Sequence, residues 1–92
     1  MSSSNQNQAI SDPVIYEKLT TIFRTILEDN GIVLRPETSE ADIPGWDSFA
    51  NASLIAAMEK EFGIRFRTAE LQSLHCVGNF ADLIRAKLQG RG

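Results

Sequence analysis

The sequence predicts an all-α fold: a small four-helix bundle with a long loop between the first and second helices and a short third helix. Residues 13–29, 48–62 and 77–88 each carry apolar residues at helical spacing, and a shorter stretch near residues 69–74 does the same. No strand pairs are evident.

The first helix is expected over residues 13–29, with Asp12 as its N-cap and Pro13 in its first turn. Asn30-Gly31 is the expected stop. Its apolar face consists of Ile15, Leu19, Ile22 and Ile26, widened by Phe23 and Leu27. The following loop, residues 30–46, is long enough to suggest a functional role. Its apolar anchors are Ile32, Leu34, Ile43 and Trp46, and its stiffening residues are Pro36 and Pro44.

The second helix is expected over residues 48–62, capped by Asp47 at its start and Gly63 at its end. Its predicted inward stripe is Ile55, Met58 and Phe62, supported by Ala52 and Leu54. A short buried link follows, formed by Ile64 and Phe66.

Thr68 is the expected cap of a brief third helix near residues 69–74, with Leu71 and Leu74 facing the core. The fourth helix, about residues 77–88, has its inward residues at helical spacing. These residues are Val77, Phe80, Leu83, Ile84 and Leu88.

The 92 residues are enough for one domain, and a content of 42% apolar and 23% charged residues suits a soluble globular protein. Residues 1–11 lack the regions of a signal peptide and are expected to form a disordered tail, which leaves residues 12–89 as the domain. No apolar run approaches the ~20 residues of a membrane span. Cys76 is the single cysteine, so no internal disulfide forms, and we expect a cytoplasmic monomer.

The net charge of -3 is unevenly distributed: residues 28–47 are acidic and the segment after Gly63 is largely basic. An acidic half repels nucleic acid and the basic half has no interleaved aromatic residues, so nucleic acid is not an expected partner. A basic surface on a protein partner would suit the acidic half.

The sequence offers little for catalysis or metal binding. His75 is the single histidine, and with Cys76 it makes a poor zinc site. A nucleophile pair formed by these adjacent residues is a weak alternative, because neighbours on a chain rarely aim at each other and no third group orients them. The chain also lacks a G-x-S-x-G elbow, a glycine-rich phosphate loop and an EF-hand. We therefore expect neither an enzyme nor a metal site.

Asp47-Ser48 lies where the long loop meets the second helix. A serine there has its hydroxyl near solvent and near unpaired backbone amides, at the positive end of the helix dipole. A phosphodiester on this hydroxyl would be well tolerated. On the dipeptide alone, the simpler interpretation is an ordinary helix start.

Three ordered motifs together resemble the acyl carrier protein family. They are Gly45-Trp46-Asp47-Ser48-Phe49, then Met58-Glu59-Lys60-Glu61-Phe62-Gly63-Ile64, and finally the segment that runs from Cys76-Val77-Gly78 to Leu83-Ile84. The resemblance covers roughly residues 14–88 and implies a four-helix bundle of acyl-carrier type. It also implies that Ser48 carries a 4'-phosphopantetheine arm, which a separate phosphopantetheinyl transferase moves from coenzyme A with the help of Mg²⁺.

The resemblance further implies that acyl groups are held as thioesters on the arm and presented to partner enzymes. These partners would be an acyl-loading ligase or transferase and the synthase or modifying enzymes of a fatty acid, polyketide or other pathway. Family members shelter acyl chains between their helices, and plain core packing explains the matching residues here equally well. The candidates for the pocket or the partner surface are Phe49, Ile55, Met58, Phe62, Ile64 and Leu71.

Three departures from the family pattern point to a specialised carrier. Phe49 replaces the usual leucine, Cys76 replaces a capping threonine, and residues 50–53 are uncharged where carriers of fatty acid synthesis are usually acidic.

One alternative is an aminoacyl or peptidyl carrier, although Asp47 before Ser48 favours an acyl carrier. A second alternative is a helical interaction module without a prosthetic group. The short chain suggests a free-standing protein, although a domain excised from a synthase would look similar.

Overall fold

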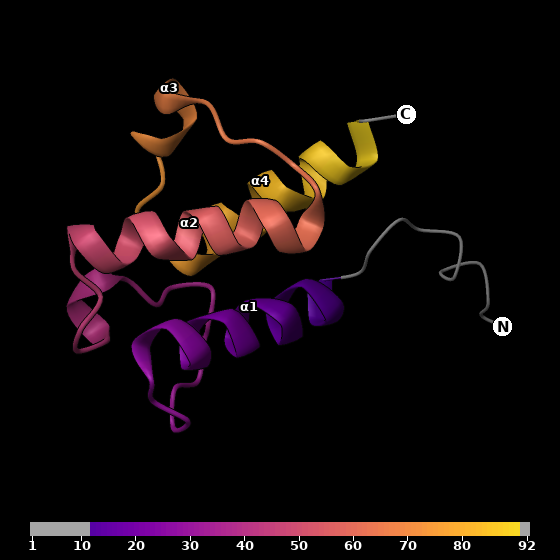
Figure 1. The fold of residues 1–92 in the computed structure, drawn as a ribbon. Coiled ribbons are helices and arrows are strands. Elements are labelled where there is room, and N and C mark those ends of the chain that lie inside the picture. Colours follow the sequence, from indigo (N-terminus) through magenta and orange to yellow (C-terminus); the bar gives the residue numbers. More distant parts are fainter. Residues whose placement is uncertain (1–11, 91–92) are drawn as a thin grey trace, which may run out of the picture.

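The computed structural model describes residues 12–90, which form helices joined by loops (Figure 1). In chain order these are α1 (Asp12–Leu27), the short 3-10 helix η2 (Glu40–Asp42), α2 (Ser48–Phe62), α3 (Thr68–Leu71) and α4 (Val77–Gly90). No strand occurs within the described residues, so the predicted all-α bundle with a long first loop and a short third helix is confirmed. The tail expected at residues 1–11 lies outside them.

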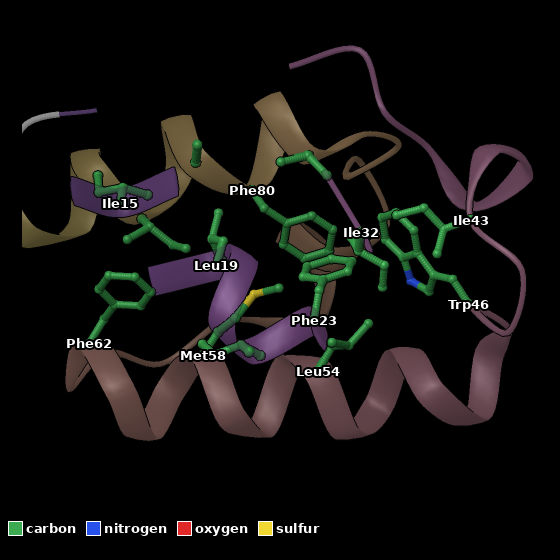
Figure 2. Packing of buried hydrophobic residues seen from close by; sticks show 14 of the residues in the cluster. Ile15, Leu19, Phe23, Ile32, Ile43, Trp46, Leu54, Met58, Phe62 and Phe80 are labelled. Carbon is green, nitrogen blue, oxygen red and sulfur yellow. The ribbon is translucent and has the colours of Figure 1, made fainter. Parts of the chain in front are cut away.

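The bundle is held by the packing of α1 against α2 and α4 (Figure 1). The side chains that fill the space between these helices come from all three, together with anchors from the loop and the links (Figure 2). Burial of this apolar area is the main stabilising contribution to the fold. The buried residues are Ile15, Leu19, Ile22, Phe23, Ile32, Ile43, Trp46, Leu54, Met58, Phe62, Ile64, Val77, Phe80, Ala81 and Ile84.

The first helix ends at Leu27, earlier than the sequence suggested. Glu28 takes the left-handed conformation, with φ of 54°, and the amide of Asp29 donates to the carbonyl oxygen of Arg24 at 3.1 Å. This is the usual helix stop with a glutamate in place of glycine. The expected stop at Asn30-Gly31 is therefore wrong, because Gly31 already belongs to a turn in which its amide donates to the Asp29 carboxylate.

The second helix has the predicted bounds but a different inward stripe. Leu54, Met58 and Phe62 are buried at intervals of four residues, whereas Ile55 is only half-buried and Ala52 is exposed. The helix is therefore rotated so that Leu54 takes the central place expected for Ile55. Ile55 still packs at the edge of the core.

The long loop is fixed to the start of α4 by two backbone hydrogen bonds. The amides of Val77 and Gly78 donate to the carbonyl oxygens of Thr38 and Pro36, each at 2.8 Å. These bonds satisfy two of the amides that a helix leaves unpaired at its start. A Cβ on Gly78 would come within 2.8 Å of the Pro36 oxygen, so the close approach depends on glycine. The predicted anchors Ile32, Ile43 and Trp46 are buried, and Leu34 is half-buried.

The third helix is a single turn, shorter than predicted, and its N-cap is Arg67 rather than Thr68. Glu70 closes this turn by accepting from the Arg67 amide at 2.8 Å, and it also pairs with Lys87 of α4 at 2.9 Å. The Arg67 hydrogen bond and then the Lys87 contact lower the pKa of Glu70 below its ordinary value. Leu74 packs against the core and Leu71 is half-buried. Polar contacts therefore supply much of what holds α3 in place.

The fourth helix continues to Gly90, beyond the predicted end. Its predicted inward residues Val77, Phe80 and Ile84 are buried, and Leu83 is half-buried. Within residues 12–90, no helix is long and apolar enough to cross a membrane.

Candidate functional site

Ser48 is the first residue of α2, and its side chain is exposed to solvent. Asp47 precedes it in an extended conformation and accepts a hydrogen bond from the Ala50 amide through Oδ1 at 2.8 Å. The Asp47 carbonyl oxygen accepts from the Asn51 amide at 2.8 Å, which begins the helical ladder. The predicted Asp47 cap is thus confirmed. It fixes the point at which the chain turns into the helix and presents the serine hydroxyl outward.

The backbone around Ser48 favours a negative group on its side chain. The Asp47 cap satisfies the Ala50 amide, while the amides of Ser48 and Phe49 have no partner among the described residues. Unpaired amides at the start of a helix of 15 residues carry a partial positive charge. A phosphodiester on the Ser48 hydroxyl would lie beside these donors. The arrangement therefore fits a covalently attached phosphate.

Trp46 anchors the loop directly before this site. Trp46 is 5% exposed, and its ring packs edge-on against Phe23 of α1, with ring centroids 4.9 Å apart. Its indole Nε1 donates to Asn51 Oδ1 in α2 at 2.9 Å. In Figure 2 the ring lies at the loop end of the buried cluster, near Ile43. One side chain thus connects the residue before the cap to two helices, so Ser48 has a fixed position although it is exposed.

Phe49 lies beside Ser48 and is 83% exposed, the most exposed large apolar side chain in the described part of the chain. Ala52 and Ala56 follow it on the exposed surface of α2, and no charged residue occurs between Ser48 and Met58. Single exposed apolar residues are common on protein surfaces, and Phe49 is one that directly follows the candidate serine. The surface of α2 that follows Ser48 therefore carries no charge as far as Met58.

The remaining pocket candidates occupy different environments. Met58, Phe62 and Ile64 are buried in the core, whereas Ile55 and Leu71 are half-buried at its edge. Ile64 lines a cavity of about 470 Å³ together with Gly63, Arg65, Lys87 and Gly90. The other four residues do not line this cavity. The cavity therefore does not support the predicted pocket as a whole.

A second cavity, of about 330 Å³, is lined by Trp46 and Asn51 among others and was not predicted. Of its lining residues, Trp46 and Asn51 are the nearest to Ser48 in the sequence. The others come from η2, from the link after α3 and from α4. Its lining comes from four separate segments, so no local pattern in the sequence indicates it.

His75 and Cys76 both contribute backbone groups to the start of α4. His75 is exposed, and Cys76 is half-buried where α4 begins, its carbonyl oxygen accepting from the Asn79 and Phe80 amides. Asn79 Oδ1 in turn accepts from the His75 amide at 2.9 Å. Within residues 12–90, no group of three or more His, Cys, Asp or Glu side chains is placed to hold a metal ion. Both residues serve the start of the helix.

These features define a class of protein: a small helical bundle that presents a rigidly placed, exposed hydroxyl at the start of a helix. A family model described as the phosphopantetheine attachment site matches residues 17–84. The solution structure of a holo acyl carrier protein from Geobacter metallireducens is similar, with a TM-score of 0.77 and 44% identity. The match covers 80% of this chain and 85% of that one. The comparison with curated proteins gave no match.

The chain therefore belongs to the acyl carrier protein family. Its cofactor is 4'-phosphopantetheine, attached covalently. Proteins of this family carry their cargo and do not themselves catalyse its conversion.

Proposed function

We propose that Ser48 is the residue that bears the arm and that the protein presents acyl thioesters to partner enzymes. The exposed hydroxyl at the first position of α2, beside two unpartnered amides, is the observation that carries this assignment. Asp47 supports it by holding the start of the helix in place. The family model spans this residue, since it matches residues 17–84.

Attachment requires a separate phosphopantetheinyl transferase. The Ser48 hydroxyl oxygen forms a new bond to the phosphorus next to pantetheine in coenzyme A, and the pyrophosphate bond breaks. The hydroxyl proton is lost and adenosine 3',5'-bisphosphate leaves, so the transfer balances without another reactant. The thiol at the end of the arm then holds the acyl group. Tethering gives that group a high effective concentration at each partner's active site.

The surface around Ser48 supports a specialised carrier with a dedicated loading ligase or transferase and its own synthase or modifying enzymes. Residues 49–58 of α2 carry no charge, and the basic residues Arg65 and Arg67 follow α2. Partners that recognise an acidic helix by charge would gain little here. A fatty acid, polyketide or related pathway remains the proposed setting, with an aminoacyl carrier as the alternative. The domain limits of 12–89, the cytoplasmic location and the monomeric state stay predictions.

The attachment is tested by incubating the protein with coenzyme A and a broad-specificity transferase and measuring its intact mass. We expect a gain of one phosphopantetheine in the wild type and none in Ser48→Ala. Ser53→Ala is the matched control, because it removes a hydroxyl from the same helix and should still be modified. A gain that persists in Ser48→Ala, or no gain with several competent transferases, would contradict the assignment.

A further inference from the structure

The cavity of about 470 Å³ lies at the end of α2 opposite Ser48. Gly63 caps the end of α2 and Gly90 is the last residue of α4, so the cavity forms where these two helix ends meet. Figure 1 shows both ends on the same side of the bundle. Because α2 has 15 residues and a helix rises about 1.5 Å per residue, roughly 22 Å separate this end from Ser48. A short segment bound here leaves the start of α2 uncovered.

Arg65 supplies this cavity with a charge that has no partner in the protein. It is exposed, and within residues 12–90 its side chain makes no hydrogen bond or ion pair. The described residues that line the cavity include no Asp or Glu that could occupy it. A guanidinium presents a planar fork of donors that matches a carboxylate. The unused donors of Arg65 therefore favour an acidic ligand.

Lys87 adds a second cation, which is held in place. Its Nζ pairs with Glu70 of α3 at 2.9 Å, and its side chain is 20% exposed. Glu70 does not line the cavity, and an ammonium group has three donors, so Lys87 can still donate to a ligand. Because Glu70 offsets the charge of Lys87, Arg65 is the residue that decides the preference for an acid.

The rest of the lining suits a peptide segment better than a small anion. The volume lies within the range of ligand pockets and exceeds what one carboxylate or phosphate group fills. Ile64 contributes an apolar side chain, and the stem of Lys87 is also apolar. The cavity therefore fits a segment in which an acidic side chain lies next to an apolar one.

The charge distribution of the chain directs an acidic segment to this end. Residues 28–47, which lead up to Ser48, are rich in acids, and Arg35 is the only basic residue among them. The segment after Gly63 is largely basic. Like charges repel and opposite charges attract, so an acidic partner distinguishes the two ends of the bundle.

We propose that this cavity is a docking site for an acidic segment of a partner protein, in which a carboxylate of the segment pairs with Arg65. The partner holds the protein by the end of α2 that is remote from Ser48 and does not cover the serine. Such a contact retains the protein in an assembly and takes no part in the modification of Ser48. It does not depend on whether Ser48 carries the arm.

The test is a titration of the full, isotope-labelled chain with the acetylated peptide Glu-Leu-Glu-Glu, followed by NMR. The matched control is the acetylated peptide Gln-Leu-Gln-Gln, which has the same shape without the charge. We expect the acidic peptide to shift the backbone amide signals of Gly63, Arg65 and Gly90 and to leave those of Ser48 and Phe49 in place. The glutamine peptide should shift none of them.

Arg65→Gln should raise the Kd of the acidic peptide by about twofold to fivefold, the loss expected for one exposed ion pair. Arg35→Gln is the matched control, because it removes the same charge from an exposed arginine that does not line the cavity. This variant should bind the peptide as the wild type does. Both arginines are exposed, so both variants should keep the fold, which circular dichroism checks.

Three results would each overturn the proposal: equal binding of the glutamine peptide, wild-type affinity in Arg65→Gln, or an equal loss of affinity in Arg35→Gln. Sedimentation of the protein with phosphatidylglycerol vesicles, without any shift by the peptide, would overturn it in favour of a membrane surface. Failure of Ser48 to gain mass would refute the attachment and leave the peptide titration unaffected, so the two failures are distinguishable.

Discussion

The two phenylalanines of α2 show how differently one helix uses its ends. Phe49, at the start, is 83% exposed, whereas Phe62, at the end, is 7% exposed and packs into the core. In Figure 2, Phe62 lies beside Ile15 at the opposite end of the buried cluster from Trp46. Phenylalanine therefore contributes to the core at the end of α2 and is left almost fully exposed to solvent at its start.

The two ends of α2 are held in place in different ways. The end of α2 at Phe62 is fixed by burial and by Gly63, whose φ of 68° completes the left-handed cap. The start of α2 is fixed by the Asp47 cap and by Trp46, which lies in the loop before it. The exposed residues Ser48 and Phe49 are thereby held in place without being buried. Under the proposed attachment at Ser48, the residue that bears the arm is both exposed and fixed in position.

The largest expected effect is at the buried end. Phe62→Ala should lower the free energy of unfolding by about 3–5 kcal/mol, because it removes a ring from the core and leaves a cavity. Urea denaturation followed by circular dichroism measures this change. Phe62→Leu is the control and should lose less, since it fills most of the space. A loss below about 1 kcal/mol in the alanine variant would break the comparison.

An intermediate effect is expected at the cap. Asp47→Ala should lower the free energy of unfolding by about 1 kcal/mol, because the Ala50 amide loses its acceptor. Asp47→Asn should keep most of the stability, because asparagine caps about as well as aspartate. The same denaturation experiment measures both variants. Equal losses in the two variants would mean that the charge of Asp47, and not its hydrogen bond, supports the helix.

The smallest effect is expected at the exposed end. Phe49→Ala should change the free energy of unfolding by no more than about 0.5 kcal/mol, because the ring contributes little to packing and alanine favours helix. The variant should nevertheless slow modification of Ser48 by a transferase, measured as the initial rate of mass gain. Ala52→Ser is the control on the same exposed surface and should retain the rate. A large loss of stability in Phe49→Ala would remove the contrast with Phe62.

Local signals in the sequence predicted much of the fold and the start of the site. The bounds of α2, the Asp47 cap and the Gly63 cap depend on residues close together in the chain, and all three are confirmed. The end of α1 is different, because Glu28 adopts the left-handed conformation. Glycine, and less often asparagine, is the usual residue in that conformation at a helix end, so the sequence did not indicate Glu28. The turn after it, closed by Asp29, satisfies the backbone before Gly31 is reached.

The inward face of α2 could not be fixed from periodicity alone. Leu54 and Ile55 are adjacent and both apolar, so the pattern allows a rotation by one residue, and the contacts with α1 and α4 decide which is buried. The length of α3 was overestimated for a related reason. Its single turn depends on Glu70, which pairs with Lys87 across a gap of 17 residues in the chain.

Short-range chemistry was therefore enough to specify the all-helical class, the bounds and caps of α2 and a serine at its start, since those depend on neighbours within a few residues. The cavity lined by Trp46 and Asn51 arises only when η2, α2, the link after α3 and α4 come together. Its volume and its lining depend on distances between distant segments, and those distances exist only in the packed chain.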